Sequence, residues 1–192
     1  NWKKDRSVGL PIPGLEVVID VEDTSGGLPI GEILVRGDNV MLGYYNAPEL
    51  TKEAIVDGWF RTGDYGYMDA DGFLYITGRK KNVIVLENGK NVYPEEIEEH
   101  LEKIRLVGEC VVVGRRAEDG ESIHITALIY PDFDYAKSVG LEDKASIEAR
   151  LKDEITALNK TLPSFRQIRK FELRDEPFPK TTSRKIIRHM VS

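Results

Sequence analysis

The pattern of apolar residues changes character after Arg79, and this change constrains the fold more than any other feature of the sequence. Before it, short apolar runs are bounded by glycine, proline and aspartate, as in antiparallel strands joined by tight turns. After it, apolar residues recur at helical spacing as well as at strand spacing. The sequence therefore predicts an α+β fold, with a small β-rich unit over residues 1–79 and an α+β domain over residues 80–192.

Three strands are expected in the first unit. The run Leu15–Val21 follows a segment rich in proline and glycine, which sets an entry turn. The run Gly31–Gly37 is bounded by glycine at both ends, and Phe73–Thr77 follows the turn signal Asp69-Ala70-Asp71-Gly72. A short helical piece is expected around residues 48–55.

Two helices and several strands are expected in the second unit. One helix begins at Pro94, with proline and glutamate in its first turn, as the helix dipole favours. The other is predicted by an apolar stripe that Pro163 ends, made of Ile147, Leu151, Ile155, Leu158 and Leu162. Strands are predicted at residues 82–86, 110–113, 123–130 and 168–173.

Charge and composition argue against several function classes. The net charge of -6 and the pI of about 5.2 argue against binding to nucleic acid or anionic membranes. No apolar run approaches the roughly 20 residues of a transmembrane helix, and the charged N-terminus shows no signal peptide. The single cysteine, Cys110, lies in an apolar run that predicts a buried, unreactive thiol and fits a reducing compartment, so we expect a cytoplasmic protein. No metal site is expected, because His100, His124 and His189 lack metal-binding spacing.

The first candidate site is the phrase Arg61-Thr62-Gly63-Asp64, which we interpret as a turn after Trp59-Phe60. A carboxylate has two acceptor oxygens and could receive two vicinal ribose hydroxyls. A turn aspartate that caps its own backbone fits the same four residues. The preceding Gly58 and the later Gly78-Arg79 favour the ribose site.

Taken in order, the motifs of this chain resemble those of acyl-CoA synthetases, which are adenylate-forming, AMP-binding enzymes. The resemblance covers essentially the whole chain and rests on Gly43-Tyr44-Tyr45, the phrase that ends at Asp64, the phrase Gly78-Arg79-Lys80-Lys81, the segment Glu87–Glu98, and the phrase Pro179–Lys185. It implies the end of the family's large domain followed by its mobile C-terminal domain, most like that of a bacterial long-chain fatty-acid–CoA ligase. The family's phosphate-binding loop is not in the sequence, so we expect a fragment that is inactive alone, with its N-terminal domain missing.

The resemblance also implies roles for single residues. Asp64 would hold the ribose hydroxyls of ATP and of the acyl-adenylate, with Arg79 assisting. Lys81 matches the hinge about which the small domain rotates between two half-reactions. Gly89 falls where the pantetheine arm of CoA passes close to the backbone, which only a residue without Cβ permits. Lys185 matches the lysine that reaches the α-phosphate and the carboxylate during adenylation.

The chemistry supports a lysine at position 185. A carboxylate that attacks the α-phosphate of ATP brings one anion onto another, so an ammonium on a long stem and a Mg²⁺ ion are the expected stabilisers. A solvated basic tail is the alternative, because Lys180, Arg184 and Arg188 lie nearby, but the Pro-Lys-Thr lead-in favours catalysis. Arg184 departs from the family, which commonly has glycine directly before this lysine.

The implied function is an ATP-dependent acid–CoA ligase. A fatty acid and ATP would give acyl-AMP and pyrophosphate, and the CoA thiol would then displace AMP. Two alternatives stay open: an adenylation domain that loads a carrier protein, and a non-catalytic module that keeps the fold. A carrier-protein sequence after Ser192 would favour the first, and intact Asp64, Arg79 and Lys185 argue against the second.

Overall fold

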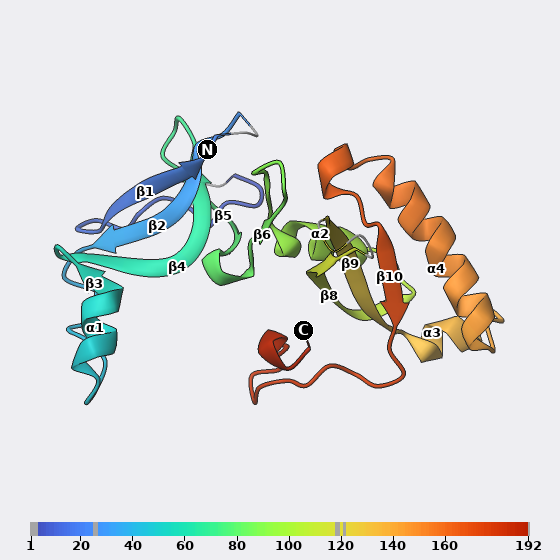
Figure 1. Ribbon diagram of the computed structural model, residues 1–192. Helices are drawn as coiled ribbons and strands as arrows, with labels where there is room; N and C mark the ends of the chain where they lie inside the picture. Colours follow the sequence, from blue (N-terminus) through green and yellow to red (C-terminus); the bar gives the residue numbers. More distant parts are fainter. Residues whose placement is uncertain (1–3, 25–26, 118–119, 121, 192) are drawn as a thin grey trace. The chain divides into compact units, whose positions relative to one another are not determined.

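The computed structural model describes residues 4–24, 27–117, 120 and 122–191 (Figure 1). The chain divides into two compact units, unit 1 with residues 1–83 and unit 2 with residues 84–192. Strands and helices occur together, so the predicted α+β class is confirmed. The placing of a domain boundary after residue 79 stays a prediction.

Unit 1 is built on an antiparallel five-stranded sheet in the order β1-β2-β4-β3, with β5 also paired to β4. The short β3 and the longer β5 pair with different parts of β4. The elements of this unit are β1 (Glu16–Asp23), β2 (Ile30–Arg36), α1 (Pro48–Ala54), β3 (Ile55–Val56), β4 (Trp59–Met68), β5 (Leu74–Arg79) and the 3-10 helix η1 (Lys80–Asn82). The three predicted strands and the short helix are therefore present.

The phrase that ends at Asp64 lies inside strand β4, so our interpretation of it as a turn is wrong. Leu34 of β2 is opposite Arg61, whereas Glu32 is opposite Tyr65, so β4 carries extra residues between these pairs. Such a β-bulge bends a strand and re-aims its side chains. Gly63 lies in the bulge at φ +70, a backbone conformation that glycine adopts without a Cβ penalty. The same glycine and short polar residues that mark a turn here form a bulge.

Unit 2 is built on a three-stranded sheet in the order β10-β9-β8, in which β8 is antiparallel and β10 parallel to β9 (Figure 1). A separate two-stranded ribbon joins β6 to β7. The elements are β6 (Ile84–Val85), β7 (Asn91–Val92), α2 (Pro94–Leu101), β8 (Val107–Arg116), β9 (Ile123–Pro131), α3 (Phe133–Ser138), α4 (Lys144–Asn159), η2 (Ser164–Arg166), β10 (Lys170–Leu173) and η3 (Arg188–Met190).

The central strand β9 is buried along its middle, from Ile125 to Ile129. The main core of unit 2 packs against it and includes three residues of the predicted apolar stripe, Ile147, Leu151 and Ile155. A smaller cluster, formed by Val111, Leu128 and Phe178, is separate from this main core. Cys110 is 4% exposed and lies in the main core, as its apolar neighbours predicted.

Several predicted elements have different bounds in the structure. The strand expected at residues 110–113 extends over β8, and the strand expected at residues 168–173 begins at Lys170. The expected strand at residues 82–86 is reduced to β6, Ile84–Val85. Its partner β7 ends at Val92, because helix α2 begins at Pro94, so the residues before Ile84 have no strand to pair with. Helix α4 ends at Asn159, so Leu162 lies beyond it, in the turn before Pro163.

None of the helices in the described part of the chain combines the length and the apolar character that a transmembrane helix needs.

Candidate functional site

Asp64 and Arg79 lie directly opposite each other on β4 and β5. The Nε of Arg79 is 2.9 Å from the Oδ1 of Asp64, and the two side chains are 53% and 27% exposed. A second guanidinium nitrogen of Arg79 donates to the backbone carbonyl of Thr62 at 3.3 Å. Such exposed ion pairs add little stability, but the two contacts of Arg79 place its guanidinium beside the Asp64 carboxylate. The structure thus brings together two residues that the sequence singled out.

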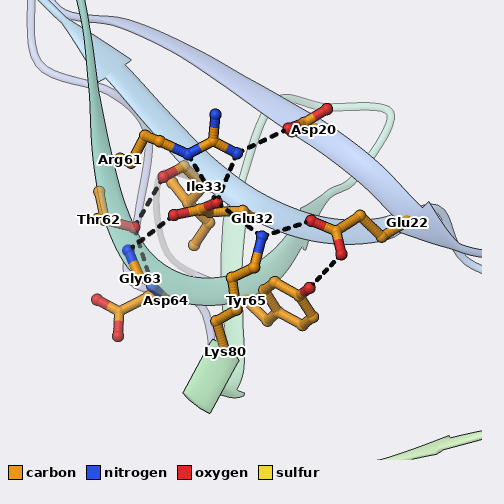
Figure 2. A network of polar contacts seen from close by, with 10 residues as sticks. All are labelled: Asp20, Glu22, Glu32, Ile33, Arg61, Thr62, Gly63, Asp64, Tyr65 and Lys80. Carbon is orange, nitrogen blue, oxygen red and sulfur yellow. Dashed lines mark hydrogen bonds and ion pairs between the residues drawn. The ribbon is translucent and has the colours of Figure 1, made fainter. Parts of the chain in front are cut away.

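The bulge of β4 is held by hydrogen bonds on both sides of Gly63. The hydroxyl of Thr62 donates to the Ile33 carbonyl at 2.7 Å and accepts from the Asp64 backbone N–H at 3.1 Å. The backbone N–H of Gly63 donates to Oε1 of Glu32 at 3.2 Å. Figure 2 shows the Asp64 carboxylate directed away from these contacts.

Glu32 is the centre of a polar network that the sequence analysis missed. Its side chain is only 4% exposed, and its Oε2 lies 3.0 Å from Nη2 of Arg61 and 3.1 Å from Nζ of Lys80 (Figure 2). A buried carboxylate is tolerated only when it is paired and hydrogen-bonded, and Glu32 meets both conditions. The available signal was one acidic residue inside the otherwise apolar run Ile30–Val35.

Three further groups complete this network. Lys80 also contacts Glu22 at 2.8 Å, and Arg61 contacts Asp20 at 3.3 Å. The hydroxyl of Tyr65 donates to Glu22 at 2.5 Å. The hydrogen bond from Lys80 lowers the pKa of Glu22, and burial raises the pKa of Tyr65 to about 12. Glu22 therefore stays ionised and Tyr65 stays protonated at neutral pH.

Lys81 and Gly89 belong to different units. Lys81 is exposed and lies within the 3-10 helix η1 of unit 1. Gly89 lies in the turn of unit 2 in which its N–H donates to the Leu86 carbonyl at 2.9 Å. Its φ of +74 explains the glycine, and a Cβ built there meets nothing within 4 Å. The turn therefore requires glycine for its own conformation and leaves open space beside it.

Lys185 lies in a closed turn near the C-terminus. The backbone N–H of Thr181 donates to the Lys185 carbonyl, and that of Arg184 donates to the Thr181 carbonyl, both at 2.9 Å. Arg184 has a φ of +62, the left-handed conformation that favours glycine. The side chain of Lys185 is exposed, and its ammonium contacts no carboxylate within the described residues. The geometry leaves this ammonium available to an external anion.

This turn, residues 181–185, is called the lysine turn and is fastened at both ends to the rest of unit 2. Before it, Glu109 accepts from Lys180 at 2.6 Å and from the backbone N–H of Phe178 at 3.0 Å. After it, Arg188 pairs with Glu98 of helix α2. Glu98 also accepts from the backbone N–H of Val112 at 2.6 Å.

Glu98 is the second buried glutamate that the sequence analysis missed. Burial is the main reason that its pKa is raised, although Arg188 opposes the shift. The available signal was its place in the sequence, directly after Ile97 and three residues before Leu101, which are both apolar. Among the described residues, no group of three or more histidine, cysteine or acidic side chains could hold a metal ion.

Curated relatives include bacterial fatty-acid ligases. The long-chain-fatty-acid–CoA ligase of Bacillus subtilis is 44% identical over 118 residues, which is 59% of this chain and 21% of the relative. The long-chain-fatty-acid–CoA ligase of Salmonella typhimurium is 37% identical over 185 residues, which is 95% of this chain and 30% of the relative. The chain therefore spans less than a third of the length of these two relatives.

Solved structures of adenylate-forming enzymes are also similar. The o-succinylbenzoate CoA synthetase of Bacillus subtilis, in complex with its acyl-adenylate intermediate, has a TM-score of 0.77 at 27% identity and covers 97% of this chain and 35% of its own. The same enzyme in complex with ATP and a magnesium ion has a TM-score of 0.71, with the same identity and coverage. These likenesses confirm the predicted resemblance to adenylate-forming enzymes.

A family match then decides the classification. Residues 81–192, more than half of the chain, match the family described as the AMP-binding enzyme C-terminal domain. This range contains the lysine turn and both of its anchors. The chain therefore belongs to the family of AMP-binding enzyme C-terminal domains.

Proposed function

We propose that this chain is the C-terminal part of an ATP-dependent fatty-acid–CoA ligase. The reaction joins a carboxylate to ATP to give acyl-AMP and pyrophosphate, and the CoA thiol then displaces AMP. The identity to the Salmonella ligase across 95% of this chain supports the substrate class. A long-chain fatty acid is the proposed substrate, and a cytoplasmic location is proposed because the reaction consumes ATP and CoA.

The observation that carries the proposal is the lysine turn. An exposed ammonium that contacts no carboxylate among the described residues, on a turn fastened at both ends, suits a group that must meet a phosphate. A lysine placed where charge develops on phosphoryl oxygens stabilises the transition state. We therefore propose that Lys185 contacts the α-phosphate during adenylation.

The residues present also fit a nucleotide ribose. Asp64 is partly exposed, oriented by Arg79, and offers a carboxylate with several acceptor positions. Vicinal hydroxyls can donate to such a carboxylate. The described residues contain no group of three or more histidine, cysteine or acidic side chains that could hold a metal ion, so we propose that magnesium binds together with the phosphates of ATP. A magnesium ion bound with ATP would neutralise phosphate charge.

The second half-reaction would use the segment around Gly89. The open space beside this turn is compatible with close approach of a pantetheine arm. We propose that the large domain ends at residue 79 and that the C-terminal domain begins at residue 80. We also propose that Lys81 is the hinge between them. The N-terminal part of the longer protein would supply the acyl pocket and the triphosphate loop.

The test compares wild type with Lys185→Ala in the full-length protein. ATP–pyrophosphate exchange is followed with short, medium and long fatty acids and with amino acids. We expect exchange with fatty acids and a loss of about 100-fold or more in the variant, typical for removal of a transition-state stabiliser. Lys152→Ala, an exposed lysine on helix α4, is the matched control and should exchange normally.

Each outcome separates the hypotheses. Exchange that survives in Lys185→Ala would disprove the proposed role of this lysine. Exchange with amino acids but not fatty acids would favour loading of a carrier protein. Absence of exchange with every acid would support a non-catalytic module.

A further inference from the structure

We propose that Glu32 is a positioning residue for nucleotide recognition, which holds the bulge of β4 in the shape that presents Asp64. The inference rests on the proposed role of Asp64 at the ribose. Glu32 itself is buried and acts through its neighbours, since its side chain is 4% exposed. Through these neighbours, Glu32 would determine the position and orientation of the Asp64 carboxylate.

The contacts of Glu32 enclose the bulge. Its Oε1 accepts from the backbone N–H of Gly63, the residue directly before Asp64. Its Oε2 accepts from Nε and Nη2 of Arg61, at the start of the bulge, at 3.2 and 3.0 Å. One carboxylate therefore fastens both a side chain and the backbone of the same short segment (Figure 2).

Few other contacts could replace this carboxylate. Thr62 ties the bulge to the Ile33 carbonyl, but this bond does not satisfy the Gly63 N–H. A partly buried backbone N–H that loses its acceptor is destabilising, so we expect the bulge to rearrange when Glu32 is removed. Asp64 follows Gly63 immediately and would move with it.

Lys80 extends the same network to the end of strand β5. Its ammonium shares Oε2 of Glu32 with Arg61 and also contacts Glu22. Lys80 follows Arg79, the ion-pair partner of Asp64, and precedes Lys81, the proposed hinge. Glu32 thus connects the strand that carries Asp64 to the chain segment that carries Arg79.

Glutamine at position 32 tests this arrangement with little change in size. Its amide oxygen can still accept from Gly63, but its amide nitrogen donates and would face the donors of Arg61 and Lys80. Two cations would then meet a donor in place of an acceptor. The expected result is a displaced bulge within a folded unit.

The experiment measures ribose recognition in the full-length protein. ATP–pyrophosphate exchange with a fatty acid is compared for ATP and 2′-deoxy-ATP, and the ratio of their kcat/KM values is taken. We expect wild type to prefer ATP and Glu32→Gln to lower this preference by about tenfold or more, since a misplaced acceptor no longer distinguishes the hydroxyl. A purely structural role of Glu32 would lower both rates equally and leave the ratio unchanged.

Two further variants complete the test. Glu49→Gln changes an exposed carboxylate of helix α1 and should keep the wild-type ratio. If Glu32→Gln does not fold, Glu32→Asp keeps the charge but shortens the side chain, so it cannot reach Gly63 and Arg61 together, and the ratio should again fall.

The outcomes distinguish the inference from the proposed function. A wild-type ratio in folded Glu32→Gln or Glu32→Asp would overturn the role of Glu32. A wild type that exchanges without preferring ATP would overturn it too, because Asp64 would not recognise the hydroxyl. Absence of exchange in wild type would overturn the proposed function itself.

Discussion

Among the described residues, each unit has one buried glutamate, Glu32 in unit 1 and Glu98 in unit 2, and the two carboxylates are neutralised differently. Glu32 of unit 1 faces two cations, Arg61 and Lys80, and each of these has a second carboxylate partner. Glu98 of unit 2 pairs closely with one cation, Arg188. Each glutamate also accepts one backbone N–H.

The difference shows that the number of cations beside a buried carboxylate determines how strongly the loss of one cation destabilises the fold. A carboxylate with two close cations keeps a partner when one is removed. A carboxylate with one close cation becomes an uncompensated buried charge, which is strongly destabilising. The raised pKa of Glu98 agrees with this weaker compensation. The anchor after the lysine turn of unit 2 should therefore depend on one ion pair, Arg188 with Glu98, whereas the bulge of unit 1 depends on a network.

The largest expected effect is that of Arg188→Met. It leaves Glu98 buried without its partner, so unit 2 should lose about 3 kcal/mol of unfolding free energy. The matched variant Lys80→Met leaves Glu32 with Arg61 and should cost unit 1 about 1 kcal/mol. Both are measured by urea unfolding of the chain.

The two units can be followed separately in that experiment. Trp59 lies in strand β4 of unit 1, and the sequence of unit 2 contains no tryptophan, so tryptophan fluorescence follows unit 1. Helices α2, α3 and α4 lie in unit 2, so helical circular dichroism mainly follows unit 2. Equal losses in the two variants would contradict the comparison.

The second prediction is an opposite response of the two units to acid. A raised pKa means that folded Glu98 binds its proton more tightly than the unfolded chain does. Protonation of Glu98 should therefore stabilise unit 2. This stabilisation is fully present below the ordinary pKa of 4.5 and is lost as the pH rises through the higher pKa of the folded state. Glu98→Gln should abolish this gain in circular-dichroism melts at pH 5 and pH 8.

Unit 1 should respond with the other sign. Hydrogen bonds from basic side chains lower the pKa values of Glu16, Glu22 and Asp69, so these groups stabilise the folded state when ionised. That stability is present above their ordinary pKa values and is lost as the pH falls through the lower folded ones. A fluorescence-detected gain of unit 1 on mild acidification would contradict the prediction.

The smallest expected effect is that of Arg184→Gly. Arg184 holds the left-handed conformation at φ +62, which costs a residue with a Cβ more than it costs glycine. Glycine also loses more chain entropy on folding, which offsets part of this benefit. The net gain in the unfolding free energy of unit 2 should be about 0.5 kcal/mol. Asn46→Gly, at φ +51 in unit 1, is the control and should gain less, since asparagine tolerates this conformation. A loss of stability in Arg184→Gly would show that the turn does not require this conformation.

Local sequence signals predicted a large part of the fold. The stripe that contains Ile147, Leu151 and Ile155 predicted helix α4, because a helical face repeats within a few residues. Pro94 predicted the start of α2, because proline and acidic residues favour the first turn of a helix. The strands of unit 1 were predicted from short apolar runs and from the glycine, proline and aspartate residues that bound them.

Features that depend on how strands pair were predicted less well from the sequence. The bulge around Gly63 looked like a turn, because glycine and short polar residues serve both structures. Only the register of β4 against β2 separates the two possibilities. The strand predicted at residues 82–86 was too long for a similar reason, since the short β7 limits its pairing.

The sequence by itself determined the class of the fold, the family motifs and the candidate residues Asp64, Arg79 and Lys185, because each follows from neighbouring residues and their order. Only the tertiary structure decided which charges are buried and what neutralises them. Glu32 meets Lys80 across 48 positions, and Glu98 meets Arg188 across 90. No local pattern encodes such pairs, because a charged residue in a strand or helix looks the same whether its partner is solvent or a distant cation.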